Sequence, residues 1–354
     1  MGAGEDANET PGSGTSILAP PPSPLPRATP PHYTRRRTST SPAMRPALLA
    51  LAVATLLPLT LSAQETPAQK TRSAKEIVDA APASAWRTPD PANTLYMDLE
   101  GGRVVIELAP GFAPAHVANI KALAKGGFWN GLSVYRVQDN FVAQFGDPDA
   151  DDTAKRKPFP HGAKDKLPAE FTRDAEGVAF DRLPDADGWA PEVGFADGFP
   201  VARDPKSGRI WMTHCYGMLG AGRGNPPDSS TAAELYVVIG QAPRALDRQL
   251  TAVGRVIDGI ELLSGIPRGP EPMGFYEDAK QRVPIRSIRL ASEVPEAERT
   301  PVQLLRTDSQ AFRDATEARR NRVDDFYSIP AGHIDLCLVP LPARAQAAEP
   351  GRSK

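Results

Sequence analysis

Val134-Tyr135-Arg136-Val137-Gln138-Asp139-Asn140-Phe141-Val142-Ala143-Gln144-Phe145-Gly146-Asp147 is the stretch that decides the fold. It places one arginine, Arg136, among the alternating apolar residues that are typical of a β-strand. A charged side chain in such a position costs free energy unless the charge is paired or has a function. The simplest interpretation is a surface strand whose arginine extends to water along its own apolar stem. A functional interpretation needs further signals elsewhere in the chain.

The residues before this stretch predict a hairpin followed by a helix. Residues 94–99 and 104–108 have strand composition and are joined by the turn sequence E-G-G-R. Pro114 then begins an amphipathic helix, which Gly126-Gly127 ends. The apolar positions of this helix are Val117, Ile120, Leu123 and Ala124.

With these neighbours, the central stretch resembles the motif F-H-R-x-x-x-x-F-x-x-Q-x-G-D of the cyclophilin-type peptidyl-prolyl isomerases, with Tyr135 in place of the histidine. The family's A-P-x-x-V-x-N is matched by A-P-A-H-V-A-N at residues 113–119, and its short E-F element by Glu170-Phe171. The strand motif G-x-L-x-M-A-N is similar to G-R-I-W-M-T-H at residues 208–214.

Two further matches follow in family order. Residues 228–239, D-S-S-T-A-A-E-L-Y-V-V-I, resemble N-T-x-G-S-Q-F-F-I, and Leu246-Asp247 with T-A-V-G-R-V-I-D-G-I at 251–260 resemble L-D-x4-V-F-G-x-V-x-x-G-M. A short helix at 260–263 and a last alternating strand at 285–290 complete the domain, which we place at residues 93–292. The resemblance implies a mainly β fold: a closed antiparallel barrel of about eight strands capped by two helices.

The resemblance also implies the site. Catalysis would rest on Arg136, Phe141 and Gln144. The substrate groove would be lined by Val142, Thr213, His214, Glu234, Tyr236, Leu246 and Leu250. Several positions depart from the family pattern: Val142 replaces a methionine, His214 an asparagine, Glu234 a glutamine, Tyr236 a phenylalanine, Ala245 a tryptophan and Leu250 a histidine. Glu234 is the main objection to activity, because it could pair with Arg136.

The implied reaction is rotation about X–Pro peptide bonds, which crosses a barrier of about 18–20 kcal/mol without covalent chemistry. A rigid, always charged guanidinium can donate a hydrogen bond to the prolyl nitrogen of the twisted amide. The expected partners are proline-containing segments of exported proteins, and no cofactor is required. A non-catalytic module on the same barrel, acting as a chaperone or in envelope assembly, is the alternative; a purely structural envelope protein is a third.

Composition and spacing argue against other functions. The formal net charge of −2 offers no basic field for nucleic acid. The acidic cluster at residues 147–152 does not fit a helix-loop-helix calcium site, because its sixth and twelfth positions hold Asp152 and Pro158 instead of glycine and glutamate. The histidines lack ligand spacing, so we expect no metal. We expect a monomer.

The N-terminal part predicts export. Residues 1–43 are rich in Pro, Ser, Thr and Gly and predict a disordered extension upstream of the true start at Met44. Residues 44–63 have the charge, the short apolar run and the small residues of a signal peptide. The apolar run is too short to span a membrane. Residues 64–92 predict a linker. We therefore expect a periplasmic protein, or alternatively a secreted one, with no membrane span in the mature chain.

The exported chain keeps two cysteines, Cys215 and Cys337. In an oxidising compartment an even pair favours a disulfide, although two buried free thiols remain an alternative. Residues 293–343 leave the family pattern and predict one or two helices packed on the barrel. The helices would begin at Thr300-Pro301 and at Thr307. A strand through Cys337 and Val339 would follow. Residues 344–354 predict a disordered tail.

Overall fold

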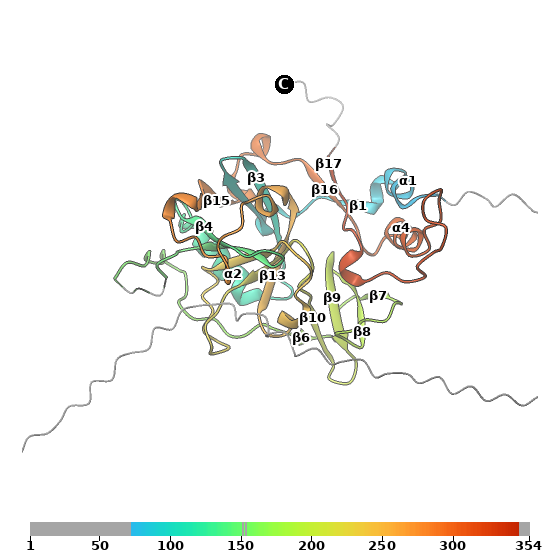
Figure 1. Cartoon of the computed structure of the whole chain (residues 1–354), viewed down its shortest axis with the longest axis horizontal. Helices are drawn as coiled ribbons and strands as arrows, with labels where there is room; N and C mark the ends of the chain where they lie inside the picture. Colours follow the sequence, from blue (N-terminus) through green and yellow to red (C-terminus); the bar gives the residue numbers. More distant parts are fainter. Residues whose placement is uncertain (1–71, 151, 153, 347–354) are drawn as a thin grey trace, which may run out of the picture. The chain divides into compact units, whose positions relative to one another are not determined.

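The computed structural model describes residues 72–150, 152 and 154–346. Three antiparallel sheets and four α-helices form this part of the chain (Figure 1). The disordered extension and the signal peptide that the sequence predicts lie outside the described residues. Among the described residues, no helix is long and apolar enough to cross a membrane.

The largest sheet has nine strands in the order β14-β4-β5-β12-β11-β13-β3-β2-β15. Its strands are β2 (Thr94–Leu99), β3 (Gly102–Leu108), β4 (Ser133–Val137), β5 (Val142–Gly146), β11 (Met218–Ala221), β12 (Leu235–Val238), β13 (Thr251–Asp258), β14 (Val283–Pro284) and β15 (Ser287–Leu290). The predicted hairpin is confirmed, because Thr94 to Leu99 pair in register with Glu107 to Gly102. The strands of the family motifs at 134–147, 235–239, 251–260 and 285–290 all belong to this sheet.

Helix α2 (Pro114–Lys125) covers one side of the sheet's core, and the short α3 (Glu261–Ser264) contacts β3. Pro at the first position of α2 is favourable because that amide needs no helical partner. The four predicted apolar positions are all buried in one cluster with β2, β3 and β5 side chains. The expected pair of helices is therefore present, although α3 has only four residues.

The hydrogen-bonded ladder does not close into the expected eight-stranded barrel. The two edge strands, β14 and β15, are instead consecutive in sequence and separated by Ile285 and Arg286. The Ile285 amide donates to Leu132 O, and the Arg286 amide donates to Asp98 O. Ile285 O also accepts from the Gly131 amide, so these two residues link the two ends of a curled sheet through three backbone hydrogen bonds.

A second sheet lies between β5 and β11 in the chain, and of its strands the sequence predicted the one within residues 208–214. Its order is β6-β10-β9-β8-β7, with β6 (Arg173–Asp174), β7 (Asp181–Leu183), β8 (Glu192–Ala196), β9 (Phe199–Asp204) and β10 (Arg209–Met212). Apolar side chains of this sheet, such as Val193, Phe195 and Val201, join Val142 and Tyr236 of the large sheet in one buried cluster. The inserted sheet therefore packs on the outer face of the large one.

A third sheet corrects the predicted domain limits. Strand β16 (Val302–Leu305) pairs with β1 (Trp86–Arg87) on one side and with β17 (Ala343–Ala345) on the other. Part of the predicted linker and the start of the predicted tail are therefore ordered strands. Helix α1 (Ala74–Asp79), within the same linker, contacts α4 (Gln310–Arg320). The buried Trp86 explains why this polar segment is ordered.

The C-terminal extension agrees with the sequence in one element and differs in two. Helix α4 forms, and the Ser309 side chain caps it instead of Thr307. The helix expected from Thr300 is strand β16, which pairs with β1 and β17 and buries Val302, Leu304 and Leu305. The segment through Cys337 is not a strand but a short 3-10 helix, η7 (Leu336–Leu338).

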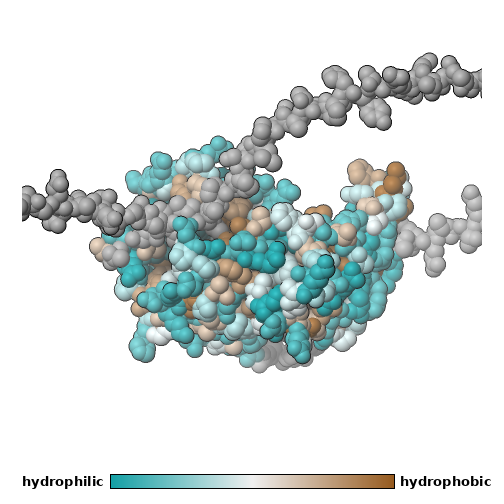
Figure 2. Space-filling model, turned by 90° about the horizontal axis from the view of Figure 1, so that it is seen from below, coloured by the Kyte–Doolittle hydropathy of each residue, from teal (hydrophilic) through white to brown (hydrophobic). Residues whose placement is uncertain are grey.

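Six more 3-10 helices lie in the connections: η1 (Ala83–Ala85), η2 (Pro91–Asn93), η3 (Arg244–Leu246), η4 (Ala279–Gln281), η5 (Ala291–Glu293) and η6 (Glu296–Glu298). On the face shown in Figure 2, apolar residues form small separate groups among polar ones.

Candidate active site

A β-bulge orients the arginine of the central motif. In the pairing of β4 with β5, Val134 lies opposite Phe145 and Arg136 opposite Gln144, so the register shifts between Val134 and Arg136. Both Val134 and Val137 consequently reach the core of the large sheet. Strict alternation of side chains along β4 predicts Val134 on the same face as Arg136, and that prediction is wrong for Val134.

The Arg136 guanidinium donates to three amide oxygens. Nε donates to Met273 O at 2.7 Å, Nη1 to Gln144 Oε1 at 2.9 Å, and Nη2 to Gln138 Oε1 at 2.5 Å. Gln138 in turn donates through Nε2 to Pro272 O at 3.3 Å. Each acceptor is neutral, so this fixed guanidinium keeps its full positive charge.

Arg136 is completely enclosed, with a relative exposure of 0%. The Phe275 ring lies under the guanidinium at 4.9 Å from Cζ, and the Phe141 ring lies at 5.9 Å. Burial lowers the pKa of Arg136 to about 10, which still leaves the group protonated at neutral pH. The site therefore holds a desolvated cation in contact with two aromatic rings.

A chain of hydrogen bonds connects Arg136 to Glu234. Because Arg136 can only donate, it fixes Gln144 with Oε1 toward the guanidinium and Nε2 toward Tyr135 Oη, at 2.6 Å. Tyr135 then donates to Glu234 Oε2, also at 2.6 Å. Burial, followed by the Glu234 charge, raises the pKa of Tyr135, which keeps its hydroxyl proton available as the donor.

These hydrogen bonds explain two departures from the family pattern together. Tyr135 stands in the histidine position and Glu234 in the glutamine position, and the two side chains contact one another directly. Glu234 also accepts from the Asp147 amide at 2.7 Å. Glu234, which could have paired with Arg136 directly, is thus connected to it through Gln144 and Tyr135.

Gly146 makes room for that carboxylate. A Cβ at this position would lie 2.3 Å from Glu234 Oε1, and its φ of 151° is unfavourable for other residues. The glycine of the F-G-D sequence is therefore needed where the Glu234 side chain crosses β5. A cavity of about 230 Å³ adjoins Glu234 and is also lined by Phe128, Lys157 and Phe159.

The predicted groove residues are brought together but are mostly buried. Val142, Thr213 and Tyr236 have relative exposures of 0%. His214, Glu234 and Leu250 are also buried, whereas Phe141 and Leu246 are half-buried. The inserted sheet packs against these side chains, so the expected open groove is largely filled by the protein itself.

The strand that flanks β12 comes from a segment that sequence reasoning did not select. Residues 208–214 were matched to the family strand, but β10 belongs to the inserted sheet and pairs with β9 and β6. Strand β11 pairs with β12 instead, placing Gly220 opposite Tyr236. Both strands directly follow a glycine and contain a short apolar run with a methionine, so the pattern alone did not separate them.

Thr213 and His214 have internal partners at the end of β10. Thr213 Oγ1 donates to Pro200 O at 3.1 Å. The His214 amide donates to Asp247 Oδ1 at 2.9 Å, its Nδ1 lies 3.0 Å from the same oxygen, and its Nε2 lies 2.9 Å from Tyr236 Oη. Burial raises the pKa of Tyr236, and the Asp247 charge adds to this.

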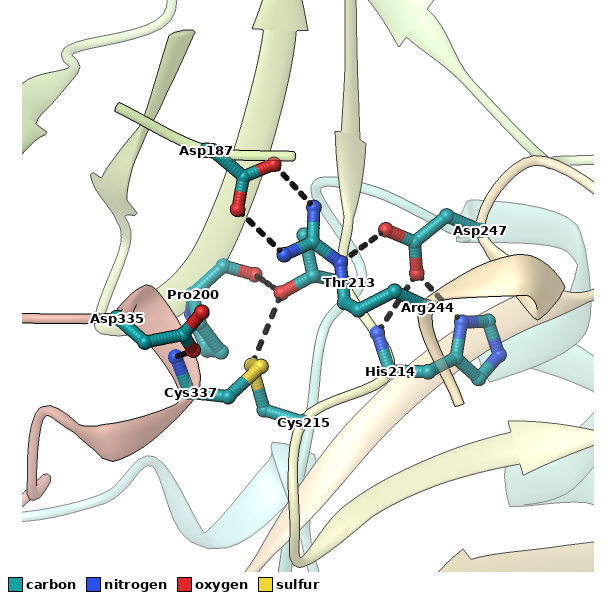
Figure 3. The surroundings of a disulfide bond; sticks show 9 residues. All are labelled: Asp187, Pro200, Thr213, His214, Cys215, Arg244, Asp247, Asp335 and Cys337. Carbon is teal, nitrogen blue, oxygen red and sulfur yellow. Dashed lines mark hydrogen bonds and ion pairs between the residues drawn. A yellow bond between two sulfur atoms is a disulfide. The ribbon is translucent and has the colours of Figure 1, made fainter. Parts of the chain in front are cut away.

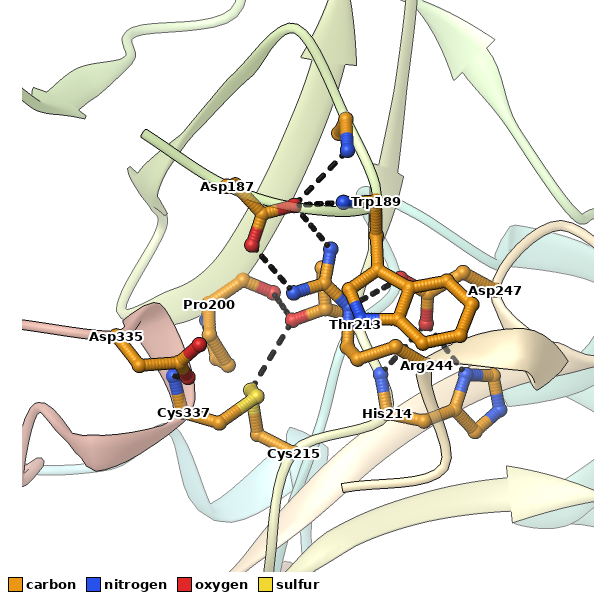
Figure 4. Close-up of polar contacts among 11 residues, drawn as sticks. Asp187, Trp189, Pro200, Thr213, His214, Cys215, Arg244, Asp247, Asp335 and Cys337 are labelled. Carbon is orange, nitrogen blue, oxygen red and sulfur yellow. Dashed lines mark hydrogen bonds and ion pairs between the residues drawn. A yellow bond between two sulfur atoms is a disulfide. The ribbon is translucent and has the colours of Figure 1, made fainter. Parts of the chain in front are cut away.

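This network continues into the inserted sheet through Arg244, which sequence reasoning did not select (Figure 3). Arg244 Nε donates to Asp247 Oδ2 at 2.5 Å, and its two terminal nitrogens contact the Asp187 carboxylate at 3.0 and 3.2 Å. The amides of Trp189 and Ala190 bind the same carboxylate, which fixes the loop before β8 (Figure 4). The only sequence signal was an arginine three positions before Asp247.

The disulfide lies beside this network. Cys215 and Cys337 are bonded, with a Cα–Cα distance of 5.0 Å, and Thr213 Oγ1 lies 3.3 Å from Cys215 Sγ (Figure 3). The bond links the C-terminal extension to the segment after β10. No group of three or more His, Cys, Asp or Glu side chains suited to a metal ion occurs among the described residues.

The chain matches a known protein family over the length of the large sheet. Residues 94–290 match the family model described as cyclophilin type peptidyl-prolyl cis-trans isomerase/CLD. A protein of Brucella suis biovar 1 named probable peptidyl-prolyl cis-trans isomerase is 29% identical over 187 residues, covering 51% of this chain and 75% of that protein. Peptidyl-prolyl cis-trans isomerase B of Bacillus subtilis is 46% identical over 56 residues, covering 16% and 39%.

The fold has a solved counterpart. The crystal structure of cyclophilin AquaCyp293 from Hirschia baltica superposes with a TM-score of 0.58 at 25% identity. The match covers 75% of this chain and 94% of that one. It therefore extends beyond the 94–290 match into the parts of the chain outside the family motifs.

Proposed function

Because the chain belongs to the cyclophilin-type peptidyl-prolyl cis-trans isomerase family, we propose that it accelerates the isomerisation of X–Pro bonds through Arg136. Twisting the amide breaks its conjugation and leaves a lone pair on the prolyl nitrogen. A guanidinium hydrogen bond to that nitrogen stabilises the twisted amide more than either planar form, and it thereby lowers the barrier. No group has to transfer a proton or form a covalent bond.

The observation that carries this proposal is the set of neutral acceptors around Arg136. The three amide oxygens orient the guanidinium but leave its charge uncompensated. The surrounding aromatic rings keep water away, so the electrostatic effect of that charge is strong. A carboxylate in direct contact would have weakened it, and Glu234 acts instead through Tyr135 and Gln144.

For the substrate we propose that Phe141 and Leu246, which keep exposed surface, contact the proline ring. Val142, Tyr236 and Leu250 form the layer beneath them. Thr213 and His214 hold that layer through Pro200 O, Asp247 and Tyr236. Glu234 and its cavity would accommodate a neighbouring substrate residue. The proposed substrates are proline-containing segments of exported proteins, and the protein would act without a cofactor, as a monomer.

The test is a protease-coupled assay on a short Ala-Pro peptide. Removal of one preorganised donor commonly costs about 10²–10³-fold in rate, so Arg136→Ala is expected to lose most of the enhancement. Arg286→Ala removes an exposed arginine and serves as the matched control. An Arg136→Ala enzyme as active as the control would remove this residue from the role assigned to it.

One observation favours a second candidate, a non-catalytic module that binds proline segments. Arg136 has no exposed surface in the structure, and a peptide cannot contact it without displacing a neighbouring group. A wild-type protein that binds the Ala-Pro peptide without changing its isomerisation rate would favour this binding function.

A further inference from the structure

A further buried arginine, Arg255, lies on the outer face of the large sheet and is not among the predicted site residues. Arg255 of β13 is 6% exposed, and its Nε has no hydrogen-bond partner among the described residues. It forms an ion pair with Glu107, whose Oε2 lies 3.6 Å from Nε, beyond hydrogen-bonding distance, and the Phe199 ring lies 5.9 Å from Cζ. A buried cation without hydrogen bonds is costly and would ordinarily be replaced by an apolar side chain.

Glu107 is shared between Arg255 and a second arginine. Both of its oxygens accept bonds from Arg87, at 2.5 Å from Nη1 and 3.0 Å from Nη2. One carboxylate therefore faces two guanidinium groups, and the cluster carries a net positive charge. Burial lowers the pKa of Arg255 to about 10, so it remains charged at neutral pH.

Arg255 lines a cavity of about 220 Å³ between β11, β13 and the C-terminal extension. It is the one charged residue among the described residues that line this cavity. The other walls include Met218, Val256, Leu336 and Leu341, and Leu338 at the rim is largely exposed. The volume corresponds to roughly seven water molecules at ~30 Å³ each.

We propose that this cavity binds a carboxylate that carries a short apolar chain. The carboxylate would supply the hydrogen-bond acceptors that Arg255 lacks, and Arg–carboxylate pairs are favoured when both groups are desolvated. The apolar chain would contact the aliphatic walls. A free short-chain acid and the carboxyl terminus of a polypeptide ending in an apolar residue share this chemistry.

The proposal is tested on the full chain by isothermal titration with hexanoate and with its neutral isostere hexanamide. Hexanoate is expected to bind at least about tenfold more tightly, because a charge-assisted hydrogen bond exceeds a neutral one. Equal binding of the two probes, or no hexanoate binding, would overturn the proposal. This comparison uses the wild-type protein and does not depend on any variant folding.

Arg255→Met then identifies the residue, with Arg286→Met as the matched control. We expect Arg255→Met to lose hexanoate binding by at least about tenfold while isomerisation of the Ala-Pro peptide is unchanged, which separates this site from the proposed active site. Hexanoate affinity unchanged in Arg255→Met would contradict the assignment. A peptide ending in leucine, compared with its C-terminal amide, distinguishes the two sources. Binding of the peptide with a free carboxyl terminus, but not of the amide, indicates a polypeptide terminus. Binding of hexanoate but of neither peptide indicates a small free acid.

Discussion

Arg136 and Gln138 set the properties of the candidate active site at the residue scale. Gln138 accepts from the guanidinium and is itself half-buried, whereas the other acceptors, Met273 O and Gln144, are a backbone group and a buried side chain. Gln138 is therefore the partner that a substrate can displace most easily. Its hydrogen bond competes with the one proposed for the prolyl nitrogen.

We predict that Gln138→Ala increases kcat/KM for an Ala-Pro peptide. Loss of a competing hydrogen bond of about 1 kcal/mol corresponds to roughly a fivefold gain. Gln281→Ala, an exposed glutamine in η4, is the control and should change nothing. A decrease in kcat/KM for Gln138→Ala would mean that this side chain positions Arg136 instead of competing for it.

The family resemblance predicted Arg136, Phe141 and Gln144 as one group, and in the structure both Gln144 and the Phe141 ring lie beside the Arg136 guanidinium. It did not predict the contact between Tyr135 and Glu234, which are 99 positions apart. It also did not predict that Val134 and Val137 both face the core, because a bulge breaks the alternation on which that inference rested. The contact of Arg244 with Asp187 and that of Arg255 with Glu107 could not be predicted either, because these partners come from distant segments.

At the scale of elements, the inserted sheet and the C-terminal extension have changed the outer face of the fold. The inserted sheet is held by the Arg244–Asp187 contact and by an apolar cluster shared with Val142 and Tyr236. The extension is held by the disulfide and by Leu336 and Val339 in the same cluster. Both elements lie over the region where the groove was expected.

We predict that the disulfide contributes strongly to the stability of this arrangement. It joins residues separated by 122 positions, and the chain-entropy model assigns about 4–5 kcal/mol to a loop of this length. The double variant Cys215→Ser, Cys337→Ser should unfold at a lower urea concentration than the oxidised protein. Dithiothreitol should destabilise the wild type and leave the variant unchanged; identical midpoints for the variant and the oxidised wild type would contradict the prediction.

Elements that match family motifs were predictable because their apolar periodicity is strong, as in β2, β3 and α2. The inserted sheet was not predicted, apart from β10, because several of its strands are short and alternate with Asp, Gly and Pro, so their composition is that of a loop. Strand β16 was mistaken for a helix because Thr300-Pro301 is also a good helix start. In that case pairing with β1 and β17 determined the outcome.

At the scale of the whole molecule, we propose that the protein is exported, from the signal-peptide pattern at residues 44–63 and from the paired cysteines. Mass spectrometry of the protein isolated from its host should find a mature N-terminus near Gln64. Recovery of a chain that retains residues before Met44 would contradict both the proposed start and the cleavage.

Catalysis by Arg136 is the central claim, and exchange spectroscopy by proton NMR on an Ala-Pro peptide at equilibrium tests it most directly. The wild-type protein should raise the cis-to-trans and trans-to-cis rates by the same factor and leave the ratio of the two forms unchanged, because a catalyst lowers one shared barrier. Arg136→Ala should bring both rates back close to those in buffer. Exchange rates in the presence of the wild-type protein that equal those in buffer would contradict the account.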